Sequence, residues 1–312
     1  NRNFAYIEQD LNISYTTLLN LLHQYDLKDL LINTRSHFQQ EVINFIKSLN
    51  IHYIENNRSI IKPYELDIYI PEKQLAIECN GTYWHSSKLH SDKQYHYNKS
   101  VMCEEQGIRL IHIFEYEWYN DRQRPILENI IKNALGINNN KIYARKLDIE
   151  VRKSIDMKEF FNTNNIQGFR GGKFAICLVD KSTREVYMSY MMGYPFFGKG
   201  KYEWEVIRGA TKLGHTVIGG ASKIFSYFIK TYNPTNCVYY IDYNYFNGNS
   251  LKNLPQMEFI KTQPSFKNYW VTTGEVKNRE PLHHKEIKQL IAKNLVIPIY
   301  NAGTKVYVWE RE

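Results

Sequence analysis

Residues 65–85 read ELDIYIPEKQLAIECNGTYWH and are the most informative stretch of the chain. Apolar residues on either side of Pro-Glu-Lys predict two short β-strands joined by a tight turn. Asp67 lies in the first predicted strand and Glu78 in the second. Carboxylates on adjacent strands can converge on one side of a sheet and bind a hard divalent cation through oxygen. With His85 close by to move protons, the pattern indicates metal-assisted hydrolysis of a phosphodiester.

The composition indicates a folded protein with nucleic acid as its partner. The chain has 312 residues, of which 43% are hydrophobic, enough to build substantial cores. Its net charge is +8, and 25 Tyr, 15 Phe and 5 Trp are interleaved with the basic residues. Basic and aromatic side chains together favour double-stranded DNA, although most of the aromatic residues are expected in the core.

Cysteine spacing and apolar patterning exclude other classes of protein. Cys79, Cys103, Cys177 and Cys237 have no CxxC spacing, so we expect reduced thiols and no zinc module. No apolar run reaches the ~18 residues of a membrane span. We therefore expect a cytoplasmic protein of a phage or bacterial host cell, with no membrane partner.

The first 34 residues have a helical pattern that breaks at Asn12-Ile13-Ser14. A short helix, a turn and a second helix capped by serine predict a DNA-binding helix-turn-helix in residues 1–34. A plain helical hairpin is the alternative. On the first interpretation, the residues facing the groove are Ser14, Tyr15, Thr16, Thr17 and Asn20.

Residues 35–138 predict a compact domain of helices and strands. Glu41 lies inside its first helix, where it either serves a metal site or is simply solvated. The run Asn138–Lys141 predicts a linker and a domain boundary. The pattern favours helices at 36–49, 95–106 and 124–135, and strands at 51–55, 64–70, 74–79 and 108–114.

Residues 139–312 predict a separate mixed-sheet domain of the α+β or α/β class. Gly219-Gly220-Ala221-Ser222 offers backbone N–H groups to an anion at a helix start, and Lys223 would add charge. Close packing of helix on strand is the alternative reason for these glycines. The pattern favours strands at 173–180, 184–193, 202–208, 237–242, 256–262, 294–299 and 304–309, and helices at 154–164, 219–232 and 283–293.

The central motifs resemble the very-short-patch-repair (Vsr) mismatch endonucleases and their homing-endonuclease relatives. The resemblance covers residues 36–135 and rests on Asp67 with its apolar strand, Gly81-x-Tyr83-Trp84-His85, and the later run Gly107–Trp118. It implies a nuclease core of the PD-(D/E)xK superfamily. It also implies that Asp67 binds the metal, that His85 is the general acid or base, and that Glu41 lies beside the metal site.

Further candidate residues follow from the burial pattern and from the same resemblance. Glu78, in an apolar strand, needs a cation or a partner, so Glu78 and the Cys79 carbonyl are candidate ligands beside Asp67 for Mg²⁺ or Mn²⁺. Tyr83 and Trp84 match the aromatic pair that wedges between bases in mismatch enzymes, and they could equally pack in the core.

The chain also departs from the Vsr pattern. Where the family has an acidic residue in the helix before Gly107, this chain has His96, with Lys99 one turn further on. Either could supply the proton relay or hold the attacking water, and lysine is the usual third member of the superfamily motif. The cysteines of the Vsr zinc site are missing, which favours a nicking or homing-type nuclease over mismatch repair.

The Gly-Gly-Ala-Ser loop resembles the cofactor loop of GNAT acyltransferases and of the phage Mom-type DNA-modification domain. The run Asp242-Tyr243-x-x-Phe246-x-Gly248 fits the closing strands of that family. The resemblance implies a GNAT-like C-terminal domain. Such a domain would either transfer an acyl group or dock DNA, with a phosphate held by the loop and Lys223.

The sequence therefore predicts a three-part, sequence-specific DNA endonuclease of homing or phage type, with Mg²⁺ or Mn²⁺ as cofactor. One active centre per chain would nick DNA, and a homodimer would cut both strands. The alternative is a DNA-modification acyltransferase of the Mom/GNAT type whose nuclease-like part finds the target. A third hypothesis is a DNA-binding protein with an inactive nuclease domain, because the acidic residue before Gly107 is missing.

Overall fold

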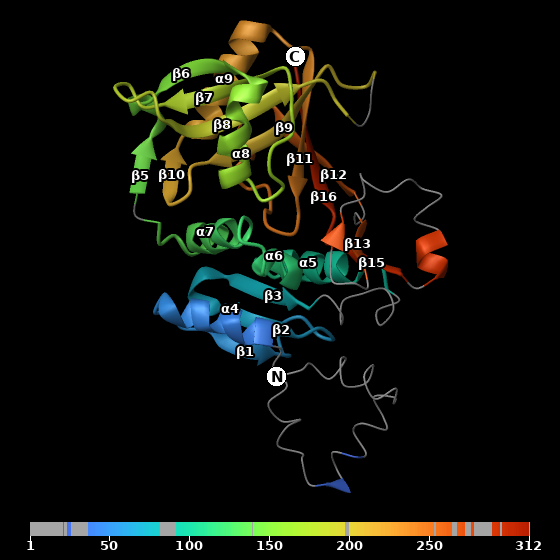
Figure 1. The fold of residues 1–312 in the computed structure, drawn as a ribbon. Helices are drawn as coiled ribbons and strands as arrows, with labels where there is room; N and C mark the ends of the chain where they lie inside the picture. Colours follow the sequence, from blue (N-terminus) through green and yellow to red (C-terminus); the bar gives the residue numbers. More distant parts are fainter. Residues whose placement is uncertain are drawn as a thin grey trace. The chain divides into compact units, whose positions relative to one another are not determined.

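The computed structural model of the chain (Figure 1) has two compact units, Asn1–Leu49 and Asn50–Glu312. Helices and strands are mixed in several sheets, which confirms the predicted α/β and α+β class at that level. The finer division into residues 1–34, 35–138 and 139–312 stays a prediction. The structure describes residues 21, 24–25, 37–81, 92–138, 140–196, 200–252, 254–263, 267–271, 276–277, 289–293 and 295–311.

In the first unit, helix α4 spans His37–Ser48, as the sequence predicts. Its apolar residues recur at the spacing of one helix face, which favours an amphipathic helix. Lys47 in the last turn is stabilised by the negative end of the helix dipole. The buried side chains of this face are Phe38, Val42, Ile43 and Ile46.

The second unit begins with a four-stranded sheet of order β1-β2-β3-β4. Strand β2 pairs antiparallel with both β1 and β3, whereas β3 and β4 are parallel. The turn between β2 and β3 is a 3₁₀ turn, Pro71–Lys73, closed by Gln74 in the left-handed conformation with φ 48°. The strands are β1 (Ile54–Asn57), β2 (Leu66–Ile70), β3 (Leu75–Asn80) and β4 (Arg109–Phe114).

Helices complete this part of the second unit. Because β3 and β4 are parallel, a crossover must connect them. The crossover contains helix α5 (Tyr95–Glu105), which contacts β4. Helices α6 (Glu115–Trp118) and α7 (Arg124–Leu135) follow β4. Helix α7 ends where Gly136 adopts φ 74°, a conformation that favours glycine. The elements predicted here are confirmed, with β1 shifted toward its C-terminal end.

A larger sheet of seven strands follows, in the order β12-β16-β11-β9-β8-β7-β6. Its neighbouring strands are antiparallel except for β9 and β11, which are parallel. The strands are β6 (Asp148–Lys153), β7 (Phe174–Val179), β8 (Val186–Gly193), β9 (Trp204–Thr211), β11 (Asn236–Asp242), β12 (Met257–Gln263) and β16 (Thr304–Glu310).

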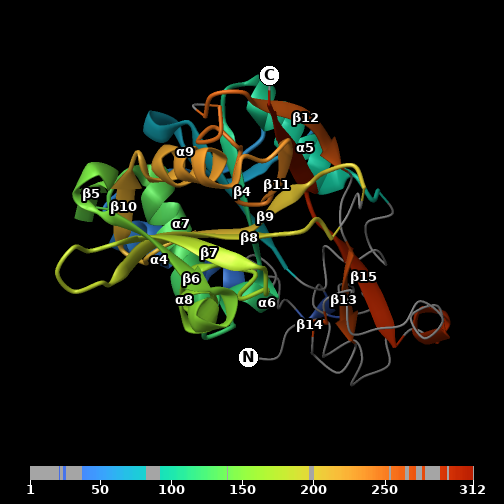
Figure 2. The same ribbon diagram turned by 90° about the horizontal axis from the view of Figure 1, so that it is seen from above.

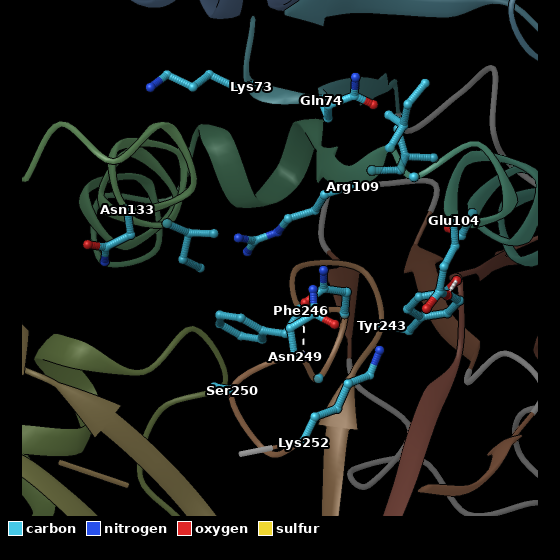
Figure 3. A pocket seen from close by; sticks show the side chains of 17 residues that line it. Lys73, Gln74, Glu104, Arg109, Asn133, Tyr243, Phe246, Asn249, Ser250 and Lys252 are labelled. Atoms are coloured by element: carbon cyan, nitrogen blue, oxygen red, sulfur yellow. Dashed lines mark hydrogen bonds between the residues drawn. The ribbon is translucent and has the colours of Figure 1, made fainter. Parts of the chain in front are cut away.

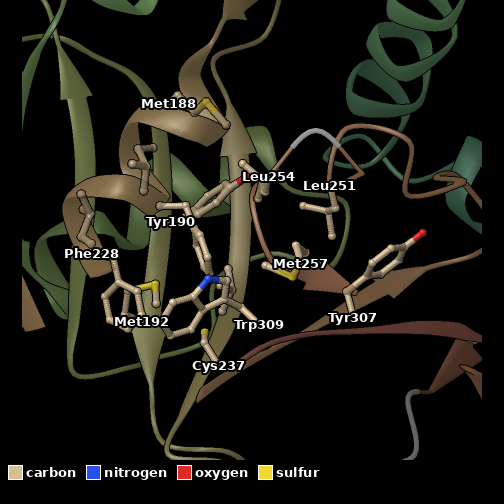
Figure 4. Close-up of a cluster of buried hydrophobic side chains, with 14 of the residues drawn as sticks. Met188, Tyr190, Met192, Phe228, Cys237, Leu251, Leu254, Met257, Tyr307 and Trp309 are labelled. Carbon is tan, nitrogen blue, oxygen red and sulfur yellow. The ribbon is translucent and has the colours of Figure 1, made fainter. Parts of the chain in front are cut away.

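Two helices cover opposite faces of this sheet (Figure 2). Helix α9 (Gly220–Tyr232) contacts β7 and β8 and buries Phe225 and Phe228 in the larger core, part of which is drawn in Figure 4. Helix α8 (Lys158–Asn164) buries Phe161 against alternate residues of β7 on the other face. Burial of apolar area on both faces, at roughly 25 cal/mol per Å², holds these layers together.

Two smaller sheets complete the second unit. Strands β5 (Asn140–Tyr143) and β10 (His215–Ile218) pair parallel. A three-stranded sheet of order β14-β13-β15 lies between β12 and β16 in the chain. Within the described ranges, every helix is too short or too polar to reach across a bilayer. The remaining elements are β13 (Lys267–Val271), β14 (Val276–Lys277), β15 (Val296–Tyr300), and 3₁₀ turns at Ala144–Lys146 and Ser154–Met157.

The loop that follows β11, residues 243–252, joins the two sheets of the second unit. It lies along the edge of β4, where the His112 backbone N–H donates to the Asn244 carbonyl at 2.8 Å. The Tyr245 hydroxyl donates to Glu117 Oε1 at 2.6 Å. From the other side, the Arg122 guanidinium donates to the carbonyls of Asn162, Asn165 and Ile166 at 3.0, 2.9 and 2.7 Å.

Glu117 makes the stability of the fold depend on pH. Burial raises its pKa from 4.5 to about 8, so the folded protein keeps a proton that the unfolded chain loses. The resulting stabilisation is complete below pH 4.5 and is lost as the pH rises through about 8.

We therefore expect the free energy of unfolding in urea to fall as the pH rises across this window, and Glu117→Gln to make that fall smaller; Glu78, whose pKa burial also raises, accounts for part of the remainder. Glu310→Gln, which changes an exposed carboxylate at the end of β16, is the control. An equal slope in wild type and Glu117→Gln would contradict this assignment.

Candidate active site

Asp67 and Glu78 lie on neighbouring strands and on one face of the first sheet. The register pairs Ile68 with Ile77, so the next pair along the strands is Asp67 with Glu78. The Cys79 backbone N–H donates to Asp67 Oδ2 at 2.8 Å. Asp67 is half-buried and reaches solvent, whereas Glu78 is only 2% exposed. The structure thus brings together the two carboxylates singled out from the sequence.

Helix α5 supplies the counter-charge to this pair. The Lys99 ammonium forms an ion pair with Glu78 Oε1, and both side chains are buried. The second oxygen, Glu78 Oε2, is buried and has no hydrogen-bond partner among the described residues. A buried carboxylate oxygen without a donor is costly in an apolar setting. That oxygen is therefore available to a cation.

The three charges shift one another's pKa values. Burial, reinforced by the charge of Asp67 and opposed by Lys99, raises the pKa of Glu78 above its usual value. Burial also raises the pKa of Asp67, against the opposing effects of Lys99 and the Cys79 N–H. Burial works to lower the pKa of Lys99, but the charges of Glu78 and Asp67 outweigh it and raise this pKa above its usual value. Lys99 therefore stays protonated.

A second polar group lies beside Glu78, on strand β4. His112 is opposite Glu78 in the parallel register and is fully buried. Asn80 Nδ2 donates to His112 Nδ1 at 3.3 Å, which leaves the other ring nitrogen to donate to Ser100 Oγ at 2.8 Å. The His96 ring meets the His112 ring edge-on, with centroids 5.2 Å apart. The structure thus places His96 in the buried layer between α5 and the sheet.

His112 and Ser100 are the site residues that the sequence analysis missed. His112 lies in the nearly continuous apolar run of β4, and Ser100 follows Lys99 in α5. A histidine inside an otherwise apolar strand was the one signal that could have found them, since such a ring needs buried hydrogen-bond partners.

The donor set fits magnesium better than zinc. Among the described residues, no group of three or more His, Cys, Asp or Glu side chains converges. Two carboxylates and the Cys79 carbonyl remain, and Mg²⁺ is usually bound by one or two carboxylates together with water and phosphate oxygens. Burial raises the pKa of the Cys79 thiol well above its usual value, and a thiol is in any case a poor ligand for Mg²⁺, which prefers oxygen.

The other predicted site residues either belong to the first unit or lie outside the described part. Glu41 Oε1 lies 3.3 Å from His37 Nδ1 within α4 of the first unit. His85, Tyr83 and Trp84 lie outside the described residues, and so do Ser14, Tyr15, Thr16, Thr17 and Asn20.

In the C-terminal part, Lys223 Nζ donates to the Ala144 and Leu147 carbonyls at 3.0 and 2.5 Å, so this ammonium is already engaged. A Cβ on Gly220 would lie 2.4 Å from Met188 Sδ and 2.9 Å from Val217 Cγ1, so a glycine here favours close packing of helix on strand.

Comparison with known proteins gives no relative from which a role could be transferred: no protein-family model and no curated protein matches the chain.

Removing the charge of Lys99 should destabilise the fold, because Glu78 would stay buried without its counter-ion. We expect Lys99→Met to lower the free energy of unfolding in urea by about 3–5 kcal/mol. Lys158→Met, at an exposed position of α8, should change it little. Adding Glu78→Gln to Lys99→Met should recover much of the loss, since both charges are then gone. A double variant as unstable as Lys99→Met would show that the ion pair is not the cause.

Proposed function

We propose that the protein is a metal-dependent DNA endonuclease that hydrolyses phosphodiester bonds. The observation that carries the proposal is the buried Glu78–Lys99 ion pair directly beside Asp67. A fold gains little stability from such a cluster, because apolar residues of equal volume usually serve it as well or better. Perturbed carboxylates that share a site with a lysine are instead typical of catalytic centres.

Each group has a chemical role in this proposal. Asp67, Glu78 Oε2 and the Cys79 carbonyl would hold Mg²⁺ or Mn²⁺. The bound ion would supply Lewis-acid stabilisation of the charge that develops on the scissile phosphate. Lys99, held protonated by the carboxylates, would orient the attacking water or add to that stabilisation. His85 remains the predicted general acid or base, and His96 the predicted relay.

The topology supports assignment to the PD-(D/E)xK superfamily and to its Vsr-like branch. In chain order the elements are α4, β1, β2, β3, α5 and β4, with the acidic pair on β2 and β3. Asn80 stands two residues after Glu78, where the motif has lysine. Lys99 brings an ammonium to Glu78 from α5 instead. The lysine of the motif is thus replaced by a lysine from another element, and the charges of the motif are kept.

The partner in this proposal is double-stranded DNA. A net charge of +8 favours a polyanion, and contacts to several phosphates would make the affinity fall steeply with salt. A single site of this kind nicks one strand, and two chains together would cut both. Within this proposal the protein is a sequence-specific nuclease of homing or phage type.

The first test is cleavage of a mixed-sequence plasmid with Mg²⁺ and with EDTA. We expect nicking or linearisation by wild type in Mg²⁺ only, and its loss by at least ~100-fold in Asp67→Asn, because one metal ligand is removed. Asp121→Asn, which changes an exposed carboxylate before α7, should cleave like wild type. Cleavage that persists in EDTA or in Asp67→Asn would refute the assigned site. The same assay on a panel of DNA substrates covers the case in which the plasmid lacks the target sequence.

A second function is favoured by one observation on the seven-stranded sheet. Strands β9 and β11 pair through only three residue pairs, ending at Val206 and Tyr239, although β9 runs on to Thr211 and β11 to Asp242. Parallel strands that separate can leave main-chain groups for a ligand. Helix α9 connects these strands, so a GNAT-like or Mom-like acyltransferase that uses a coenzyme A thioester is the alternative.

Calorimetric titration of coenzyme A and acetyl-coenzyme A into the full chain tests this alternative. An acyltransferase should bind them with a dissociation constant in the micromolar range. Titration of adenosine monophosphate under the same conditions controls for binding of the nucleotide part alone. No heat beyond that control would eliminate the alternative and would leave the nuclease proposal untouched.

A further inference from the structure

A pocket of about 670 Å³ lies between the first sheet and the loop after β11 (Figure 3). Strand β4 contributes Arg109 to its wall, helix α5 contributes Glu104 and helix α7 contributes Asn133. The loop contributes Phe246 and Lys252 from the opposite side. The volume is that of a site for a small molecule or for one unit of a polymer.

The lining carries an excess of positive charge. Among the described residues that line it, the cations are Lys73, Arg109 and Lys252, and the one carboxylate is Glu104. That carboxylate is already neutralised, because both of its oxygens accept from Lys305 Nζ at 2.7 Å. The pocket therefore has more cationic groups than its own residues balance, and an anion would complete it.

Arg109 is the residue that most needs such an anion. Its guanidinium donates one hydrogen bond, to the Tyr245 carbonyl at 2.6 Å. Its Nε is buried without a hydrogen-bond partner, and no carboxylate of the described residues forms an ion pair with it. Burial lowers the pKa of Arg109 to about 10, which reflects a desolvated charge. A planar guanidinium suits phosphate oxygens in particular.

Aromatic and amide groups at the rim narrow the class of ligand. Phe246 lines the pocket and is 42% exposed, so its ring can be reached by a ligand. Asn249 and Ser250 are exposed beside it on the same loop. An exposed ring stacks a base, and amides and hydroxyls can bond to its edge or to a sugar. This combination of cations, ring and amides fits a nucleotide.

We propose that this pocket binds the phosphate of a nucleotide on Arg109 and Lys252, with the base stacked on Phe246. The nucleotide is either free in solution or one unit of a DNA strand. The pocket lies at the Arg109–Leu75 end of strands β3 and β4, whereas the acidic pair lies at the Glu78–His112 end. The inference therefore goes beyond the nuclease site and does not depend on it.

Binding is measured by calorimetry with the Asp67→Ala protein in EDTA, so that cleavage and the proposed metal play no part. The probes are inorganic phosphate, a nucleoside monophosphate and a short single-stranded oligonucleotide. Lys252→Ala and Phe246→Ala alter exposed residues of the pocket, so folding should be preserved. Lys181→Ala, in the exposed turn between β7 and β8, removes an equal charge far from the lining residues in sequence and serves as the matched control.

We expect Lys252→Ala to weaken binding of the monophosphate roughly tenfold or more, because a charge-assisted hydrogen bond is lost. Phe246→Ala should weaken the monophosphate but not inorganic phosphate. If only the oligonucleotide binds, and both pocket variants weaken it, the nucleotide belongs to a DNA strand. The proposal is overturned if no probe binds, or if both pocket variants bind every probe as tightly as Lys181→Ala does.

Discussion

A carboxylate buried between a helix and a sheet must be neutralised, and the ion pair between Glu78 and Lys99 does this. The contact fixes more than one charge, because it sets which face of α5 meets β3 and β4. Once Lys99 points at Glu78, Ser100 follows it against His112, and Cys103 fills the apolar layer below. Buried pairs often add little net stability, and we infer that this one serves to fix a single arrangement of helix on sheet. The first sheet and its crossover helix are therefore organised around the candidate site.

The edge of β4 imposes the second constraint. An uncovered edge strand exposes unpaired N–H and C=O groups that invite pairing with another chain. The loop after β11 covers this edge: the Asn244 carbonyl accepts from His112, and the Asn244 side chain accepts from the Ala302 N–H at 2.9 Å. The same loop places Tyr245 on Glu117. The C-terminal part of the chain thus covers the open edge of the first sheet. A division of the chain at a predicted linker does not anticipate this contact.

Periodicity predicted the regular elements well and the irregular ones poorly. The predicted strands that the structure contains include β2, β3, β4, β7 and β8. Each is a short apolar run between turn residues, a pattern that is typical of a buried strand. Strand β6, with the sequence DIEVRK, is an edge strand that is only partly buried, so its charged residues concealed it. Strands β5 and β10 pair with each other across more than 70 residues of chain, which local pattern cannot reveal.

The site was predictable in its residue types but not in its pairing. Asp67 and Glu78 stood out because strands of that composition rarely hold two carboxylates. His96 and Lys99 remained equal candidates, since residues three apart lie on the same helix face. Only packing decides that Lys99 meets Glu78 while His96 meets the His112 ring. Which residue on a helix face reaches the carboxylate depends on tertiary packing, and the sequence pattern alone does not contain it.

The candidate site and the pocket are built on the same two elements, and this fixes their spacing. Strand β4 carries His112 beside Glu78 and Arg109 at the pocket, three residues or about 10 Å apart along a regular strand. Helix α5 carries Lys99 to the acidic pair, and five residues later Glu104 to the pocket wall. Strands and helices of this length do not stretch, so a phosphate held at Arg109 keeps a constant distance from the carboxylates. A nucleic-acid strand that satisfied both sites would therefore be held in a single register over the acidic pair.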